Sequence, residues 1–106
     1  MKFELRAYDS KIGRNYYREW LDSLDEATKL KIVRRVTRLE LGNFGDVKPI
    51  GEGLSELRID YGPGYRVYFG RQNREIILLL CGSDKSGQER AIAKAKELWR
   101  EFKETK

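Results

Sequence analysis

Hydrophobic and polar residues alternate with a period of two along residues 56–69, on both sides of a Gly-Pro-Gly segment. Leu57 and Ile59 alternate with charged neighbours before this segment, and Val67 and Phe69 alternate with polar ones after it. Such alternation is typical of half-buried strands, and glycine with proline marks the turn between them. The pattern therefore predicts a β-hairpin with one apolar face and one polar face.

Side-chain parity predicts the register of this hairpin. Residues that pair across two strands share a face, so burying both apolar sets together needs a loop with an odd number of residues. A three-residue loop over residues 62–64 meets this condition and sets Ile59 opposite Val67. The pairs expected on the polar face are Asp60 with Arg66 and Arg58 with Tyr68. Two guanidinium groups and a phenol on one face suit a phosphate backbone and an unstacked base.

The rest of the pattern predicts three helices and two more strands. The expected spans are a strand over 2–8, a helix from Asp9 or Ser10 to about Leu24, a helix from near Asp25 to about Leu41, a strand over 75–81 and a helix from about Gln88 to Phe102. Residues 42–53 are predicted to form a glycine-rich loop, and residues 82–87 to end the last strand. The order β-α-α-β-β-β-α over residues 1–106 predicts a single α+β domain, with an antiparallel meander sheet packed against helices.

Several of these elements have faces that we expect to be buried. The first helix has apolar residues at i, i+4 spacing, namely Ile12, Tyr16, Trp20 and Leu24. Its short connection to the second helix favours an antiparallel pair of helices. The strand over 75–81 is apolar on both faces and is therefore expected inside the sheet. Its Cys81 is expected to share a face with Ile77 and Leu79, as a small buried apolar residue.

Composition narrows the range of chemistry. The chain has one cysteine, Cys81, and no histidine, so it can form no intrachain disulfide and lacks the commonest acid–base residue and zinc ligand. A lone cysteine suits a reducing cytosol, and no apolar run is long enough to cross a membrane. Residues 1–4 do not begin a signal peptide. We therefore expect a cytoplasmic protein with no membrane partner and no zinc site.

The net charge of the chain is +5, and its pI is near 9.4. Part of the excess lies on one side of the second predicted helix, in a basic stripe formed by Lys31, Arg34, Arg35 and Arg38. Such a stripe is most often a solvated helix face. If it is functional, it would hold ribosomal RNA through the phosphates rather than cleave anything.

Three segments carry a resemblance to a known family. They are the hairpin over 56–69, the loop over 42–46 and the strand end with its turn over 81–88. Together with the order of the elements, they resemble the RelE/ParE superfamily, the toxin halves of bacterial type II toxin–antitoxin modules. Within it the chain is most similar to the HigB-like branch, the addiction module killer proteins. The resemblance covers nearly the whole chain and implies a RelE-like, microbial-RNase-like fold.

For many members of that superfamily the activity is ribosome-dependent cleavage of mRNA. The resemblance therefore implies an mRNA interferase, an endoribonuclease that inhibits translation and needs neither metal nor organic cofactor. Its expected partners are the ribosome with its mRNA and a cognate antitoxin, a small helix-turn-helix protein. Operator DNA would be contacted only by the complex of toxin and antitoxin.

The resemblance also implies catalytic positions, which match Arg66 and Arg58 on the hairpin and Lys85 after the last strand. Because arginine cannot act as a base near neutral pH, both arginines are expected to stabilise charge at the scissile phosphate. The alternative is an ordinary ion pair with Asp60 or Glu56. Lys85 could donate a proton to the leaving oxygen, neutralise the phosphate or be merely solvated.

Two tyrosines complete the expected site. Tyr68 on the polar face, or Tyr65 nearer the turn on the other face, would stack on a base. Asp84 is expected to cap a helix rather than to act as a base. The chain departs from its relatives in having Glu56 where RelE is richer in lysine, and Ser83 where the branch usually has glycine. It also lacks the histidines that some HigB proteins use.

Two other functions fit the same fold, because a fold does not specify a function. One is a ParE-like toxin that poisons DNA gyrase and would not depend on Arg58, Arg66 and Lys85 as a cluster. The other is an inactive relic that only binds its antitoxin and causes no growth arrest.

Overall fold

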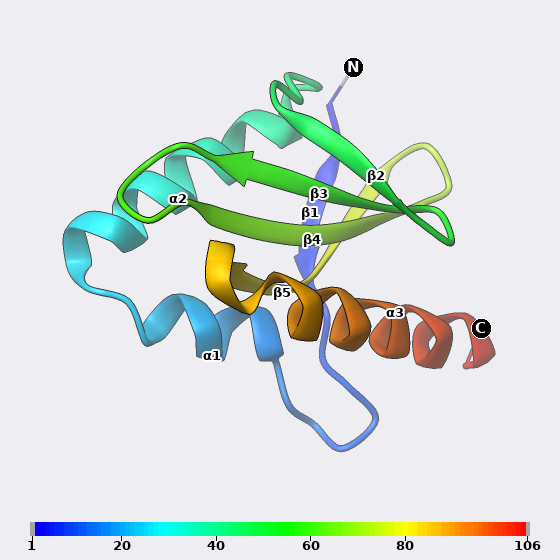
Figure 1. Cartoon of the computed structure of the whole chain (residues 1–106). Coiled ribbons are helices and arrows are strands. Elements are labelled where there is room, and N and C mark those ends of the chain that lie inside the picture. The colour runs from blue at the N-terminus through cyan, green and yellow to red at the C-terminus, as the bar shows by residue number, and fades with distance from the viewer. Residues whose placement is uncertain (1, 106) are drawn as a thin grey trace.

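The computed structural model describes residues 2–105, in which a five-stranded sheet carries helices on both faces (Figure 1). In chain order the elements are β1 (Glu4–Ala7), α1 (Tyr16–Asp22), α2 (Glu26–Glu40), β2 (Val47–Gly51), β3 (Leu54–Ile59), β4 (Tyr65–Gln72), β5 (Ile76–Asp84), the 3₁₀ turn η1 (Lys85–Gly87) and α3 (Gln88–Glu104). The predicted α+β class is confirmed. None of the helices in this part of the chain combines the length and apolar character needed to cross a membrane.

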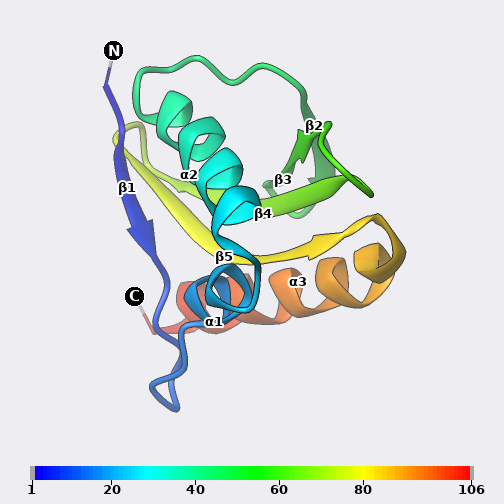
Figure 2. The ribbon, with the colours of Figure 1, turned by 90° about the vertical axis from the view of Figure 1, so that its left-hand side faces the viewer.

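The strands lie in the order β1-β5-β4-β3-β2. Strands β2 to β5 form the expected antiparallel meander, whereas β1 runs parallel to β5 and makes the sheet mixed. β5 lies between β1 and β4, and residues 76–81 are all buried, so the prediction of an interior strand is confirmed. Figure 2 shows α2 and α3 on opposite sides of β5, where each helix covers its own apolar core.

The prediction of a loop over residues 42–53 is wrong in its second half, where β2 forms an edge of the sheet. Pro49 cannot donate a backbone hydrogen bond, and the pairing with β3 shifts between Pro49 and Gly51. An edge strand tolerates both features because one side of its backbone has no partner strand. Proline and glycine therefore masked this strand in the sequence pattern.

The β3–β4 hairpin has the predicted faces but not the predicted register. Its loop comprises residues 60–64, so Ile59 pairs with Tyr65 and Arg58 pairs with Arg66. A shift of two residues keeps the parity of the loop, which is why the apolar side chains still share one face. The consequence is that the two arginines lie opposite each other instead of opposite an aspartate and a tyrosine.

The turn accounts for this shift. The N–H of Gly64 donates to the carbonyl oxygen of Tyr61 at 3.0 Å, which closes a four-residue turn inside the loop. Gly62 and Gly64 have φ angles of 56° and 89°, a region that glycine enters at little cost. Asp60 and Tyr61 are thereby drawn into the loop, and strand pairing begins at Ile59.

α1 begins at Tyr16 rather than near Ser10, the predicted start. Its N-cap is Asn15, whose side chain accepts a hydrogen bond from the N–H of Arg18 at 3.0 Å. Ser10 instead closes a short turn before the helix. Ile12 therefore lies outside the helix and is 74% exposed, contrary to the predicted apolar face. The expected antiparallel pair with α2 is also wrong, because α1 packs against β5.

β5 continues to Asp84, beyond its predicted end, and a bulge at Leu80 changes the face that Cys81 occupies. Cys81 pairs with Tyr68, but the register shifts at the next pair along the strand. Cys81 consequently packs in the core beneath α3 and not with Leu79, as predicted. The predicted burial of Cys81 is confirmed. This burial raises the pKa of the Cys81 thiol to about 12.

Candidate active site

Three of the residues expected to be catalytic line one pocket. Arg58 on β3, Arg66 on β4 and Lys85 in η1 surround a hollow of about 400 Å³ beside residues 60–64. The N–H of Lys85 donates to the carbonyl oxygen of Gly64 at 3.0 Å, which ties η1 to the hairpin loop. We term this hollow the arginine pocket.

Glu56 is completely buried and engages both arginines of this pocket. Its Oε1 accepts a hydrogen bond from Nε of Arg58 at 3.1 Å, and its Oε2 lies 3.7 Å from Nε of Arg66. Nε2 of Gln88, the first residue of α3, donates to Oε2 at 2.8 Å. One carboxylate therefore joins β3, β4 and α3. The sequence pattern does not reveal this role, because the burial of Glu56 depends on the helix that covers it.

The two arginines differ in their exposure. The side chain of Arg66 is 12% exposed and that of Arg58 is 35% exposed. Nε of Arg66 is buried without a hydrogen-bond partner among the described residues, because the Glu56 carboxylate is beyond hydrogen-bond distance. Such an incompletely satisfied guanidinium favours the approach of an anion through its other nitrogens.

Neither tyrosine of the expected site reaches the arginine pocket. Tyr68 is fully buried, and its hydroxyl lies 3.4 Å from Oγ of Ser83. Burial raises the pKa of Tyr68 to about 12 and leaves its ring no face for a base, contrary to prediction. Tyr65 packs on the other face of the hairpin, with its ring 6.3 Å from that of Trp20. The helices α1 and α3, which sequence parity cannot place, cover these two rings.

The corner between β5 and α3 presents Lys85 to solvent at the rim of the pocket. Asp84 caps η1, as predicted, and its Oδ1 accepts hydrogen bonds from Oγ of Ser86 at 2.7 Å and from the N–H of Gly87 at 3.0 Å. These bonds lower the pKa of Asp84, which makes it a poor proton acceptor. Within residues 2–105, no three carboxylate or cysteine side chains gather as a metal site.

The basic stripe of α2 lines a second hollow, of about 350 Å³, together with residues 59–61. Nζ of Lys31 lies 5.4 Å from the centre of the Tyr61 ring. Arg35 differs from the other cations of the stripe, because its Nη2 donates to the carbonyl oxygen of Phe44 at 2.7 Å. Partial burial lowers the pKa of Arg35. Arg35 thus holds the loop before β2, and the other three cations of the stripe remain exposed.

The two hollows adjoin at the end of β3, because Ile59 and Asp60 line both of them. The cations along this surface are Lys31, Arg34, Arg35, Arg38, Arg58, Arg66 and Lys85, against the carboxylates of Asp46 and Asp60. We term the lining of both hollows the basic track. Its excess positive charge suits the phosphate backbone of a nucleic acid.

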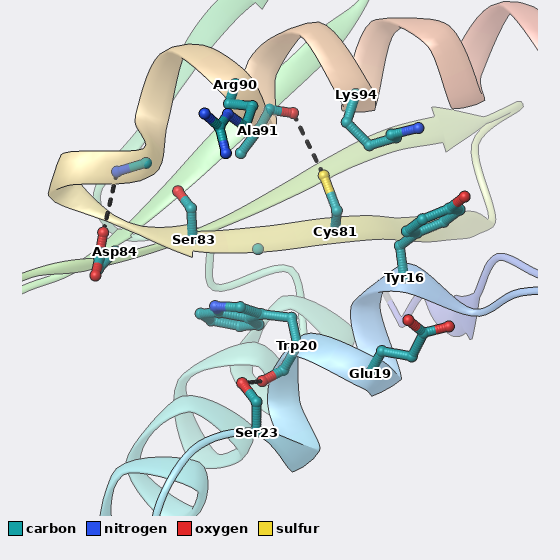
Figure 3. Close-up of a pocket in the computed structure, with 12 residues that line it drawn as sticks. Tyr16, Glu19, Trp20, Ser23, Cys81, Ser83, Asp84, Arg90, Ala91 and Lys94 are labelled. Carbon is teal, nitrogen blue, oxygen red and sulfur yellow. Dashed lines mark hydrogen bonds between the residues drawn. The ribbon is translucent and has the colours of Figure 1, made fainter.

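A third hollow, of about 590 Å³, contains no residue of the expected site. It lies between α1 and α3 with β5 as its floor, and Figure 3 shows Trp20 and Tyr16 on one side and Arg90 and Lys94 on the other. The sequence pattern does not reveal this hollow, because the hollow requires α1 and α3 to lie on the same part of the sheet.

Comparison with known proteins identifies the relatives of the chain. The model of a family described as "Phage derived protein Gp49-like (DUF891)" matches residues 19–100. An uncharacterized protein of Haemophilus influenzae (strain ATCC 51907 / DSM 11121 / KW20 / Rd) is 50% identical to this chain over 84 residues. That match covers 78% of this chain and 85% of the relative.

Proposed function

Because the chain belongs to the phage-derived Gp49-like family, a family of toxin–antitoxin toxins related to RelE- and HigB-type killer proteins, we propose that it cleaves mRNA on the ribosome. The observation that carries this proposal is the convergence of Arg58, Arg66 and Lys85 on one pocket above the buried Glu56. A toxin that only binds its target has no need of such a cluster.

The proposed reaction uses the RNA as its own nucleophile. The 2′-oxygen bonds to the adjacent phosphorus, the bond from phosphorus to the 5′-oxygen breaks, and a cyclic phosphate forms. Arg58 and Arg66 neutralise the charge that grows on the phosphate oxygens. Lys85 gives a proton to the departing 5′-oxygen. The proton of the 2′-hydroxyl passes to solvent, and positioning supplies most of the remaining acceleration.

The basic track extends this proposal beyond the scissile phosphate. Lys31, Arg34 and Arg38 hold phosphates of the neighbouring RNA, either of the mRNA or of the ribosome. The cognate partner is an antitoxin, which we propose to be a small helix-turn-helix protein that carries the toxin to operator DNA. The protein acts in the cytoplasm as a member of the HigB-like branch, without a cofactor.

Primer-extension mapping of a translated mRNA after brief expression of the chain tests this function. We expect in-frame cuts within translated regions, lost in Arg66→Ala and retained in Arg74→Ala. Arg74 is an exposed arginine outside both hollows and serves as the matched control. Growth arrest with intact mRNA would point instead to gyrase, and absence of arrest to an inactive relic.

A further inference from the structure

The hollow between α1 and α3 is an open groove with its own lining, which we term the α1–α3 groove. Its floor is the end of β5, from Cys81 to Asp84, and its walls come from α1 and α3. At about 590 Å³ it has room for several side chains of a peptide. The basic track lies elsewhere, and the lining residues of the two surfaces do not overlap.

The centre of the groove is apolar and is built for close contact. The indole ring of Trp20 lies flat over Gly82, where an added Cβ would come within 2.3 Å of the ring. Trp20 and Tyr16 are half-buried, as is Ala91 on the opposite wall. Half-exposed tryptophan and tyrosine beside a small residue are typical of sites where one protein anchors another.

Within residues 2–105, most charged side chains at the edges of the groove are engaged by other groups of the chain. Of the groove's two carboxylates, Glu19 is engaged by Nη2 of Arg14 at 2.5 Å, and Asp84 caps η1. The guanidinium of Arg90 is exposed and has no hydrogen-bond or ion-pair partner within residues 2–105. Nζ of Lys94 lies over the Tyr16 ring, 4.8 Å from its centre, and also pairs with Oε1 of Glu97 at 3.3 Å. The groove therefore complements a segment that is apolar at its centre and acidic at its edge.

We propose that the α1–α3 groove binds an acidic amphipathic segment of the antitoxin. One bulky apolar side chain of that segment lies between Trp20 and Ala91, and a carboxylate of the segment pairs with Arg90. The inference rests on the proposed function only in that a toxin of this family has an antitoxin partner. It deepens that function by assigning the partner a surface separate from the arginine pocket.

The groove also lies where a bound segment can silence the toxin. Asp84 and Gly87 line one end of the groove, and Lys85 between them lines the arginine pocket. A segment that leaves the groove at this end passes directly over Lys85. A segment extended in this direction would block access of RNA to Lys85 without any contact with Arg58.

Charge reversal on α3 tests this assignment. The probe is the purified small protein encoded by the gene next to that of this chain, titrated against the whole chain by calorimetry. We expect Arg90→Glu to weaken binding at least about tenfold, because it sets a carboxylate against the acidic edge of the segment. Arg18→Glu, an equal reversal at an exposed site of α1 outside the groove, is the control and changes binding less than about threefold.

A second variant addresses the apolar centre, and a third separates this inference from the proposed function. Ala91→Glu is expected to weaken binding as strongly as Arg90→Glu does, with unchanged unfolding temperatures confirming that both variants fold. Arg66→Ala is expected to bind the probe like the unmodified chain even though it cleaves no RNA. In cells, Arg90→Glu should stay toxic when the probe protein is co-expressed.

Four results would overturn the assignment. One is binding by Arg90→Glu and Ala91→Glu as tight as that of the unmodified chain. Another is loss of binding in Arg66→Ala alone, which would place the antitoxin in the arginine pocket. The third is groove variants that bind a short single-stranded RNA more weakly but bind the probe protein with unchanged affinity. This result would make the groove an RNA-binding surface. Failure of the probe to bind the unmodified chain counts against the assignment as well.

Discussion

A buried carboxylate between two arginines is the residue-scale feature on which the candidate site depends. Burying a charge is costly unless partners and hydrogen bonds compensate it, and Glu56 has both in Arg58, Arg66 and Gln88. The two guanidinium groups would repel each other in the absence of this charge. Glu56 therefore lets two like charges share one pocket while leaving a net positive charge for a phosphate.

Replacing that carboxylate tests its contribution to stability. Glu56→Gln is expected to lower the free energy of unfolding by about 2 kcal/mol, below the usual cost of breaking a buried pair because Arg58 is partly exposed. Urea unfolding followed by tryptophan fluorescence measures the change. Glu75→Gln, at an exposed position, is the control and should change stability by less than about 0.5 kcal/mol. Equal stabilities of the two variants would show that Glu56 does not hold the arginines.

The buried Tyr68 makes the free energy of unfolding depend on pH in the alkaline range. Its pKa in the folded chain is about 12, because burial disfavours the phenolate, whereas an unfolded tyrosine titrates near about 10. The folded state thus binds the proton more tightly. Its stability contribution is complete below about pH 10 and is lost as the pH rises toward 12.

Tyr68→Phe removes this titrating group but keeps the ring. We expect the variant to lose less stability than the unmodified chain between about pH 9 and pH 11, in urea unfolding at several pH values. Tyr17 and Cys81, whose pKa values burial also raises to about 12, remain in both proteins. Together with Tyr8, whose pKa is raised by burial and by the Glu101 carboxylate, they set the residual slope. Parallel slopes for the two proteins would contradict the burial of the Tyr68 hydroxyl.

At the same scale, the sequence predicts part of the site and misses the rest for a physical reason. Strand parity places Arg58 and Arg66 on one face of the hairpin, and Lys85 was expected only from the family resemblance. The burial of Glu56 and Tyr68 depends on where α3 lies, and no local pattern contains that information. The predicted role of Tyr68 fails for this reason, and the part played by Glu56 emerges only in the folded chain.

At the scale of elements, the end of β5 determines how α1 packs on the sheet near α3. The bulge at Leu80 changes the facing of every later residue of the strand, so Gly82 faces α1 and Ser83 faces Tyr68. Gly82 lets Trp20 lie directly on the strand, which brings α1 within reach of α3. The α1–α3 groove is therefore a product of one bulge and one glycine.

Adding a methyl group at this glycine tests the account of the element. Gly82→Ala is expected to destabilise the fold by about 1–3 kcal/mol, because its Cβ would overlap the Trp20 ring and displace α1. Gly87→Ala is the control, since its Cβ would meet its nearest neighbour at an ordinary 3.6 Å. Thermal unfolding with tryptophan fluorescence reports both effects. A Gly82→Ala protein as stable as the control would mean that Trp20 does not rest on β5.

The elements that the sequence predicts well are those whose pattern is local. The second helix begins at its Asp25 cap, and the last helix follows its apolar face, as expected. The hairpin register and the edge strand were mispredicted, because both depend on backbone choices at glycine and proline that alternation does not reveal. The two-residue slip matters for function, since it sets Arg58 opposite Arg66.

At the scale of the whole molecule, two surfaces meet at the corner between β5 and α3. The basic track collects cations from α2, β3, β4 and η1, and the α1–α3 groove opens on the other side of Asp84. An RNA on the track and a protein segment in the groove would both pass Lys85. On these two proposals, occupancy of this corner by the antitoxin segment switches the toxin off with no change in the fold.

The measurement that tests the central claim most directly is a single-turnover cleavage rate on a ribosome-bound mRNA, for the unmodified chain and Arg66→Ala. Loss of this guanidinium is expected to slow cleavage on the order of 100-fold, because the charge growing on the phosphate loses its least exposed partner. Arg74→Ala should cleave at the unmodified rate. Cleavage by a folded Arg66→Ala protein at the rate of the unmodified chain would contradict the assignment of the arginine pocket as the active site.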